Sequence, residues 1–123
     1  LCNSILIKSC FFKANLERAN LKETDCTLAD FRKADISQAD LKGAKLQDLN
    51  IYKTKMKGAN LTSARLESCD LSHTDLSECE AKRADFRRAN MNSSNLSGAN
   101  LEGANFKGAN LVNIIARDSK FLG

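Results

Sequence analysis

The sequence predicts an all-β coil made of short extended edges, with one edge and one corner in every five residues. Large apolar side chains recur at every fifth position from Leu1 to Phe121, and 22 of these 25 positions are Leu, Ile, Met or Phe. Two places earlier the residue is small, with Ala at 13 of 24 sites, and one place earlier it is Asn or Asp at 16 of 24. No insertion breaks this register. Neither a helix, with a period of about 3.6, nor a strand, with a period of about 2, produces a five-residue rhythm, so the pentapeptide is the structural unit.

Each position of the pentapeptide has a predicted role. The large residue and the small residue lie two apart, so they point inward from one face of an extended edge, and the polar residue between them points outward. The two residues that follow turn the chain, and glycine occupies the second of them at five corners: Gly43, Gly58, Gly98, Gly103 and Gly108. Corners of one hand wind the edges into a coil, and successive coils stack through backbone hydrogen bonds ~4.8 Å apart.

The spacing of phenylalanines indicates how many edges complete one coil. Phe11 and Phe31 are four pentapeptides apart, and so are Phe86 and Phe106. Four edges per coil would stack the members of each pair. Leucine-rich repeats fit poorly because their period is roughly 20–29 residues and includes a helix-like segment.

The motif A-(D/N)-L-x-x, seen in Ala14-Asn15-Leu16 and Ala29-Asp30-Phe31, resembles the pentapeptide-repeat proteins over essentially the whole chain. The resemblance implies a right-handed quadrilateral β-helix with four pentapeptides per coil, so residues 1–123 would form one solenoid of about six coils. The length of such a rod would be roughly 29 Å. Because the chain begins with Leu1 rather than Met, we expect it to be a fragment or a trimmed form of a longer protein.

Composition limits the chemistry. The net charge of +4 is a mild excess that does not by itself imply nucleic-acid binding. Five cysteines form no C-x-x-C pair, and an odd number of them suits a reducing compartment. We therefore expect small buried thiols, no metal, no cofactor and a cytoplasmic location, although a targeting segment that has been removed stays an open alternative. These cysteines are Cys2, Cys10, Cys26, Cys69 and Cys79.

No catalytic constellation is evident. His73 is the single histidine, so any triad would have to use it, with Ser72 and Asp75 close by in the sequence. A nucleophile and its base work in an ordered pocket, and a regular rod with a filled interior offers none. The sequence therefore predicts a protein that is not an enzyme.

Four faces follow from four edges per coil, and their net charges are +2, +2, +1 and −1. Some proteins of the family that this chain resembles protect DNA gyrase from quinolones by mimicking DNA. That mechanism, as the resemblance implies it, depends on a strongly acidic face. Because no face here is strongly acidic, topoisomerase protection is disfavoured.

One column of like charges is a candidate binding site. Lys13, Lys33 and Lys53 follow one another at intervals of four pentapeptides, with His73 next in the series, so they would stack at equivalent corners. Neighbours ~4.8 Å apart repel by up to ~0.9 kcal/mol in water before salt screening. Because this repulsion does not stabilise the fold, the column of lysines indicates an anionic partner. The candidate partner-binding residues are Lys13, Arg32, Lys33, Tyr52 and Lys53. The alternative is that the lysines splay apart and that Asp30 and Asp70 offset their charge.

The densest basic stretch, "AKRADFRRAN" at 81–90, has a structural interpretation. Stacking would place Glu67 beside Arg87 and Glu102 beside Lys82. Salt bridges between coils therefore account for the cluster, and exposed pairs of this kind stabilise a fold by only ~0–1 kcal/mol each.

The composition of the register changes at both ends, where apolar residues fall in outward positions. A solenoid must cover its terminal coils, and no capping helix is evident. We expect the ends to meet a missing segment of the protein or a second copy. The favoured function is a scaffold that presents a flat face or an end to a protein partner, with anion binding to nucleic acid or an acidic membrane as the alternative. The candidate end contacts are Ile5, Ile7, Phe12, Val112, Ile114, Ile115 and Leu122.

Overall fold

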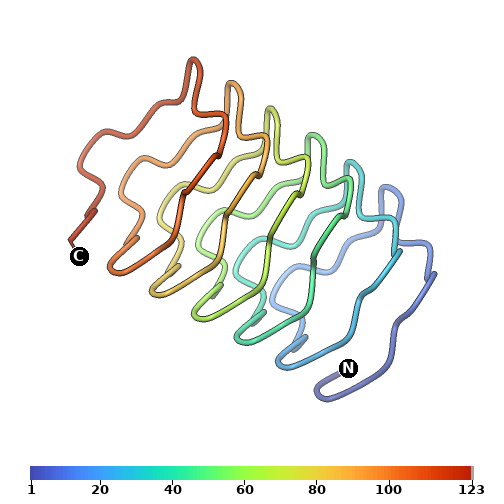
Figure 1. Ribbon diagram of the computed structural model, residues 1–123. Coiled ribbons are helices and arrows are strands. Elements are labelled where there is room, and N and C mark those ends of the chain that lie inside the picture. Colours follow the sequence, from blue (N-terminus) through green and yellow to red (C-terminus); the bar gives the residue numbers. More distant parts are fainter. Residues whose placement is uncertain (123) are drawn as a thin grey trace.

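A computed structural model describes residues 1–122, which wind as stacked coils with the two termini at opposite ends of the stack (Figure 1). The extended segments pair through single-residue parallel bridges, so the described chain has neither helices nor continuous strands. Ile5 pairs with Asp25 and Cys10 with Asp30, and the same sequence offset recurs as far as Asn100 with Lys120. Four pentapeptides therefore complete one coil, as predicted.

Each coil is joined to the next by backbone hydrogen bonds at its edges and at its corners. On one edge the Leu6 N–H donates to the Asp25 carbonyl at 2.8 Å, and the Asp25 N–H donates to the Ser4 carbonyl at 3.1 Å. At the following corner the Lys8 N–H donates to the Thr27 carbonyl at 3.0 Å. These bonds recur on all four sides, so an inner coil is bonded to the coils above and below it.

Every corner turns through a left-handed residue. The second corner position has a positive φ all along the stack, and 19 of these residues are not glycine, with φ between 54° and 60°. A hydrogen bond such as Ala14 N–H to the Phe11 carbonyl, at 2.9 Å, closes the corner in the manner of a type II turn. Left-handed φ costs a non-glycine residue roughly 1–2 kcal/mol, so stacking imposes the corner even on Leu28, with φ 60°.

The outward Asn and Asp residues close the corners from outside. The Oδ1 atom of Asn15 accepts a hydrogen bond from the Glu17 N–H at 3.0 Å, and Asp30 Oδ1 accepts one from the Arg32 N–H at 3.0 Å. The same contact recurs along the chain. Asn and Asp are the side chains suited to this short reach, which explains their frequency at the position before each large residue.

The interior is a single apolar column. Phe11 stacks on Phe31 with ring centroids 4.8 Å apart, and Phe86 stacks on Phe106 at 5.1 Å. These two contacts confirm that the phenylalanine spacing reports the length of a coil. From coil two to coil five nearly every large and small inward residue is buried, whereas the first and last coils are covered on one side only.

Ala81 is one of two alanines in the large-residue series, and the other, Ala116, lies in the last coil. Ala81 is fully buried in the stack between Leu61 and Leu101, which lie one coil to either side. We expect Ala81→Leu to raise the thermal midpoint, because a buried leucine adds apolar contact worth up to ~2 kcal/mol. The matched control is Ala84→Leu, in the same coil at a position for small residues, where overpacking should cost about 1–3 kcal/mol. A fall of several degrees for Ala81→Leu in a thermal melt would show that the site is already filled.

One column of buried hydroxyls has an unpaired member. Thr54 Oγ1 donates to the Phe31 carbonyl at 2.7 Å, and Thr74 Oγ1 donates to the Ile51 carbonyl at 3.0 Å. Ser94 occupies the equivalent position one coil further on, and its buried Oγ has no partner among residues 1–122. A buried hydroxyl without a partner costs free energy, whereas a bonded one contributes about 1 kcal/mol.

Removal of the Ser94 hydroxyl and removal of the Thr74 hydroxyl should therefore have different effects on the free energy of unfolding. Ser94→Ala is expected to leave the free energy of unfolding unchanged or raise it by up to ~1 kcal/mol, and Thr74→Val is expected to lower it by about 1 kcal/mol. Chemical denaturation of both variants measures the difference. Equal losses in the two variants would contradict the assignment of Ser94 as unpaired.

Candidate functional site

Seven side chains from the first four coils gather at one corner of the stack. They occupy the two corner positions that follow Phe11, Phe31, Ile51 and Leu71, and the pairing of successive coils places them above one another. We call this set the basic–aromatic corner. Its members are Phe12, Lys13, Arg32, Lys33, Tyr52, Lys53 and His73.

Cations and rings alternate at this corner. The charged groups of Lys13, Arg32 and Lys33 lie 5.3, 5.6 and 6.0 Å from the centre of the Phe12 ring. Lys53 lies 5.1 Å from the Tyr52 ring. Positive charge is attracted to the face of an aromatic ring, worth about 0.5–1 kcal/mol at exposed sites, so the rings hold the column together against its own repulsion.

All five residues predicted to bind a partner meet at this corner, and two more join them. Phe12 was predicted as an end contact, but it lies among three cations. His73 packs edge-on against Tyr52 with ring centroids 5.6 Å apart. The signal for Phe12 was present in the sequence, since Arg32 and Tyr52 follow it at intervals of four pentapeptides.

The acidic side chains nearby, Asp30 and Asp70, form hydrogen bonds to residues other than the corner lysines. Asp30 accepts two hydrogen bonds from the Arg32 guanidinium, at 2.9 and 2.7 Å, and this contact lowers the pKa of Asp30 below its usual value. Asp70 accepts from the Ser72 hydroxyl at 2.6 Å. Within residues 1–122 neither carboxylate forms a salt bridge with a lysine of the corner, and Asp30 pairs instead with Arg32.

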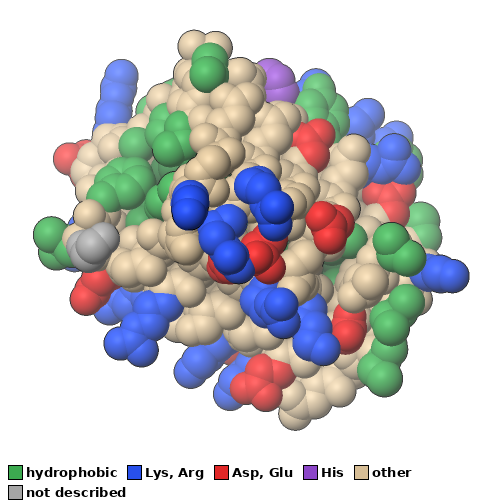
Figure 2. Space-filling view, viewed as in Figure 1, with side chains coloured by type: hydrophobic (Ala, Val, Ile, Leu, Met, Phe, Trp, Pro, Cys, Tyr) green, Lys and Arg blue, Asp and Glu red, His purple; other side chains and the backbone are tan. Residues whose placement is uncertain are grey.

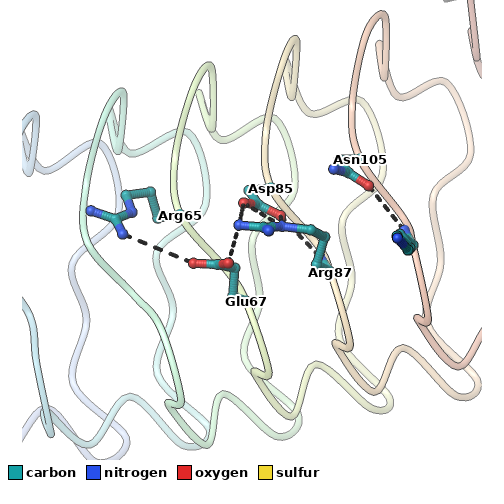
Figure 3. Close-up of polar contacts among 6 residues, drawn as sticks. Arg65, Glu67, Asp85, Arg87 and Asn105 are labelled. Carbon is teal, nitrogen blue, oxygen red and sulfur yellow. Dashed lines mark hydrogen bonds and ion pairs between the residues drawn. The ribbon is translucent and has the colours of Figure 1, made fainter.

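A second charged cluster links two coils on the neighbouring face, and its charges are paired (Figure 3). Arg87 bonds to Asp85 at 2.7 Å and also to Glu67, and Arg65 lies 4.0 Å from the same glutamate. The Arg87 guanidinium lowers the pKa of Asp85, and hydrogen bonding to Asp85 raises the pKa of Arg87. This cluster therefore joins coils.

The predicted salt bridges are thus confirmed for Glu67 with Arg87. Lys82 and Glu102 also pair, at 3.6 Å. In the space-filling view, basic and acidic side chains lie interleaved across the middle of the visible face (Figure 2). This interleaving fits the salt bridges that join neighbouring coils.

His73 and the hydroxyls near it have structural contacts. The Ser72 hydroxyl donates to Asp70, and the His73 ring contacts Tyr52. Among residues 1–122, no group of three or more His, Cys, Asp or Glu side chains is arranged to hold a metal ion.

The cysteines divide into two classes. Cys26, Cys69 and Cys79 are buried, and burial raises the pKa of Cys69 and Cys79 to about 12, so these thiols stay protonated at neutral pH. The expectation of five buried thiols is wrong for Cys2 and Cys10, which are exposed. Both lie in the first coil at outward or corner positions of the register, where no side chain of the core covers them.

The ends of the stack expose apolar side chains, as predicted. Ile5 is 76% exposed in the first coil and Leu122 is 69% exposed after the last one. Green hydrophobic atoms gather at both ends in the space-filling view (Figure 2). The outward placement expected for Ile114 is wrong, because it occupies a small-residue position and packs against the core. The remaining exposed members are Ile7, Phe12, Val112 and Ile115. No helix that could cross a bilayer occurs among residues 1–122.

Comparison with known structures gives the same architecture. A pentapeptide repeat protein from the Arabidopsis thaliana thylakoid lumen is 27% identical with a TM-score of 0.57, and the match covers 91% of this chain and 64% of that one. Rfr23 from the cyanobacterium Cyanothece 51142 is 23% identical with a TM-score of 0.51, covering 94% and 86%. A trypsin-treated variant of QnrB1, a plasmid-mediated fluoroquinolone resistance protein, is 15% identical with a TM-score of 0.57, covering 98% and 74%.

These likenesses establish the right-handed quadrilateral β-helix. The chain spans a little less than two thirds of the thylakoid-lumen protein, at 64% of its length. No curated protein sequence matches the chain significantly. The family model described as pentapeptide repeats matches residues 9–48, and the one described as a pentapeptide repeat region matches residues 53–115. With its five-residue register, its four-sided coils and these matches, the chain belongs to the pentapeptide-repeat family.

Proposed function

We propose that this protein is a non-catalytic interaction module that binds an acidic segment of another protein at the basic–aromatic corner. The observation that carries the proposal is the column of Lys13, Lys33 and Lys53, which forms no salt bridge within residues 1–122 although carboxylates lie close by. Elsewhere on the surface, several acidic side chains pair with basic ones of neighbouring coils, as Asp25 does with Lys45 and Glu67 with Arg87. A column left unpaired offers its charge to an external anion.

The packing of the rings favours a protein partner over single-stranded nucleic acid. Proteins that bind single strands stack bases on the open faces of aromatic side chains. Here Phe12 is surrounded by three cations, and Tyr52 contacts Lys53 and His73. Carboxylate side chains can approach the ammonium groups without displacing those contacts, whereas a base stacked on a ring would compete with the cations for its face.

The arrangement of polar groups supports a binding role without catalysis. The Ser72 hydroxyl donates to Asp70, so the hydroxyl next to His73 in sequence is committed to a corner hydrogen bond. Quinolone resistance belongs to QnrB1, whose likeness at 15% identity concerns the fold. The mixed charges of the four faces here do not supply the acidic surface that DNA mimicry uses.

The tyrosine of this corner gives a direct readout. Tyr52 is the single tyrosine and the chain has no tryptophan, so intrinsic fluorescence reports on the corner itself. We expect a polyglutamate peptide to change this fluorescence saturably and to bind more weakly as salt rises. Replacing Lys13, Lys33 and Lys53 by Gln together should weaken that binding by about tenfold or more, as expected for the loss of several charge contacts.

A matched control removes the same charge elsewhere. Lys8, Lys107 and Lys120 are outside the corner, so their joint replacement by Gln should leave the affinity for the peptide nearly unchanged. An equal loss in both triple variants would contradict a localised site. Tighter binding of a labelled single-stranded oligonucleotide or of phosphatidylserine vesicles than of the peptide, abolished by the corner variant, would overturn the choice of a protein partner.

A further inference from the structure

A hollow lies on a different corner of the stack. It has a volume of about 510 Å³ and is lined chiefly by Lys42, Thr62, Ser63, Lys82, Arg83 and Gly103. These residues occupy the corner positions after Leu41, Leu61, Ala81 and Leu101, two corners along the coil from the basic–aromatic corner. In a four-sided coil, two corners along means diagonally opposite.

Short side chains open the hollow. Ser63 occupies the second corner position of the fourth coil, and Gly103 occupies the same position two coils further on. A side chain added at Gly103 would contact the Arg83 stem, with the first carbon 3.5 Å from Arg83 Cγ. Arg83 therefore stands between two positions with little side chain, and it is exposed.

Positive charge and hydroxyl groups converge on this space. Lys42 and Arg83 form no salt bridge within residues 1–122, and Lys82 pairs with Glu102 at 3.6 Å. The lining contains three positive side chains, Lys42, Lys82 and Arg83, and one negative side chain, Glu102. Its net charge is therefore +2.

The hydroxyls of Thr62 and Ser63 are available as donors. Neither hydroxyl bonds to another group of the described chain. Their backbone N–H groups already donate hydrogen bonds within the chain. The Thr62 N–H donates to Asn60 Oδ1 at 3.1 Å, and the Ser63 N–H donates to the Lys82 carbonyl at 2.9 Å. Two hydroxyls and a guanidinium thus face the hollow with their side-chain donors unused.

We infer that this hollow binds a small phosphate monoester. A dianionic phosphate matches the charge of the lining and has enough oxygens to accept from Arg83, Lys42 and the two hydroxyls together. The volume lies within the range of about 300–1,000 Å³ typical of small-molecule sites, which leaves room for the organic part of the ester. Leu122 also lines the hollow and offers that part an apolar surface.

A second hollow on the next corner provides the comparison. It is lined by Arg87, Arg88, Lys107 and Gly108 and has a volume of about 350 Å³. Arg87 is committed there to Asp85 and Glu67, and no hydroxyl lines the space. Arg88 occupies the same corner position as Arg83 in the same coil, and both have positive φ. It is therefore the matched control for Arg83.

The experiment titrates the 123-residue protein with phenyl phosphate, inorganic phosphate, benzoate and phenol, following backbone and Arg side-chain NMR signals. We expect phenyl phosphate to shift the signals of Thr62, Ser63 and Arg83 and to bind more tightly than benzoate or inorganic phosphate, with no shift from phenol. Arg83→Gln should weaken phenyl phosphate binding by about tenfold, and Ser63→Ala by a few-fold. Arg88→Gln should leave the affinity unchanged.

Two results would overturn the inference. Equal weakening by Arg83→Gln and Arg88→Gln would show diffuse attraction between a basic surface and an anion. Unchanged binding in Arg83→Gln, with backbone signals elsewhere confirming the fold, would remove the hollow as the site. Replacing Lys13, Lys33 and Lys53 by Gln should not alter phenyl phosphate binding, so failure here and failure at the basic–aromatic corner are distinguishable.

Discussion

The backbone hydrogen bonds between successive coils are the interaction on which the rest of the structure depends. They fix an offset of four pentapeptides on all four sides, from the pairing of Ile5 with Asp25 to that of Asn100 with Lys120. They also hold 19 non-glycine residues at positive φ, including Leu28 and ten Lys, Arg, Glu or Gln residues for which this conformation is unfavourable. Corner geometry is therefore a property of the stack and does not depend on which residue occupies the corner.

The same offset creates the surface features. Any side chain is stacked on its equivalent in the next coil, so similar residues at that spacing become columns and opposite charges become bridges. Arg87 meets Glu67 in this way, and the lysine column meets Phe12 and Tyr52. At the Arg87 cluster the opposite charges of neighbouring coils are paired, and at the basic–aromatic corner Lys13, Lys33 and Lys53 lie beside aromatic rings.

The most regular part of the chain borders both hollows because its corners are glycines. Gly103 and Gly108 belong to the run of Gly-Ala-Asn repeats, which by pattern alone is only geometry. In the stack each of these glycines borders a hollow, beside Arg83 in one case and Arg88 in the other. A corner without a side chain leaves space next to the long side chain of the coil below it, and regular repeats can thereby form recesses.

Some features of this structure follow from the sequence alone and others do not. The sequence by itself determined the five-residue unit, the inward and outward positions and the length of the coil, because apolar period and phenylalanine spacing are local signals of burial and stacking. It also determined that five residues of the basic–aromatic corner lie together. Only the tertiary structure decided that the Asp30 carboxylate pairs with Arg32 and that Ser63 and Gly103 border a hollow. Those outcomes depend on which side-chain atoms reach one another across coils, and a one-dimensional register does not contain that information.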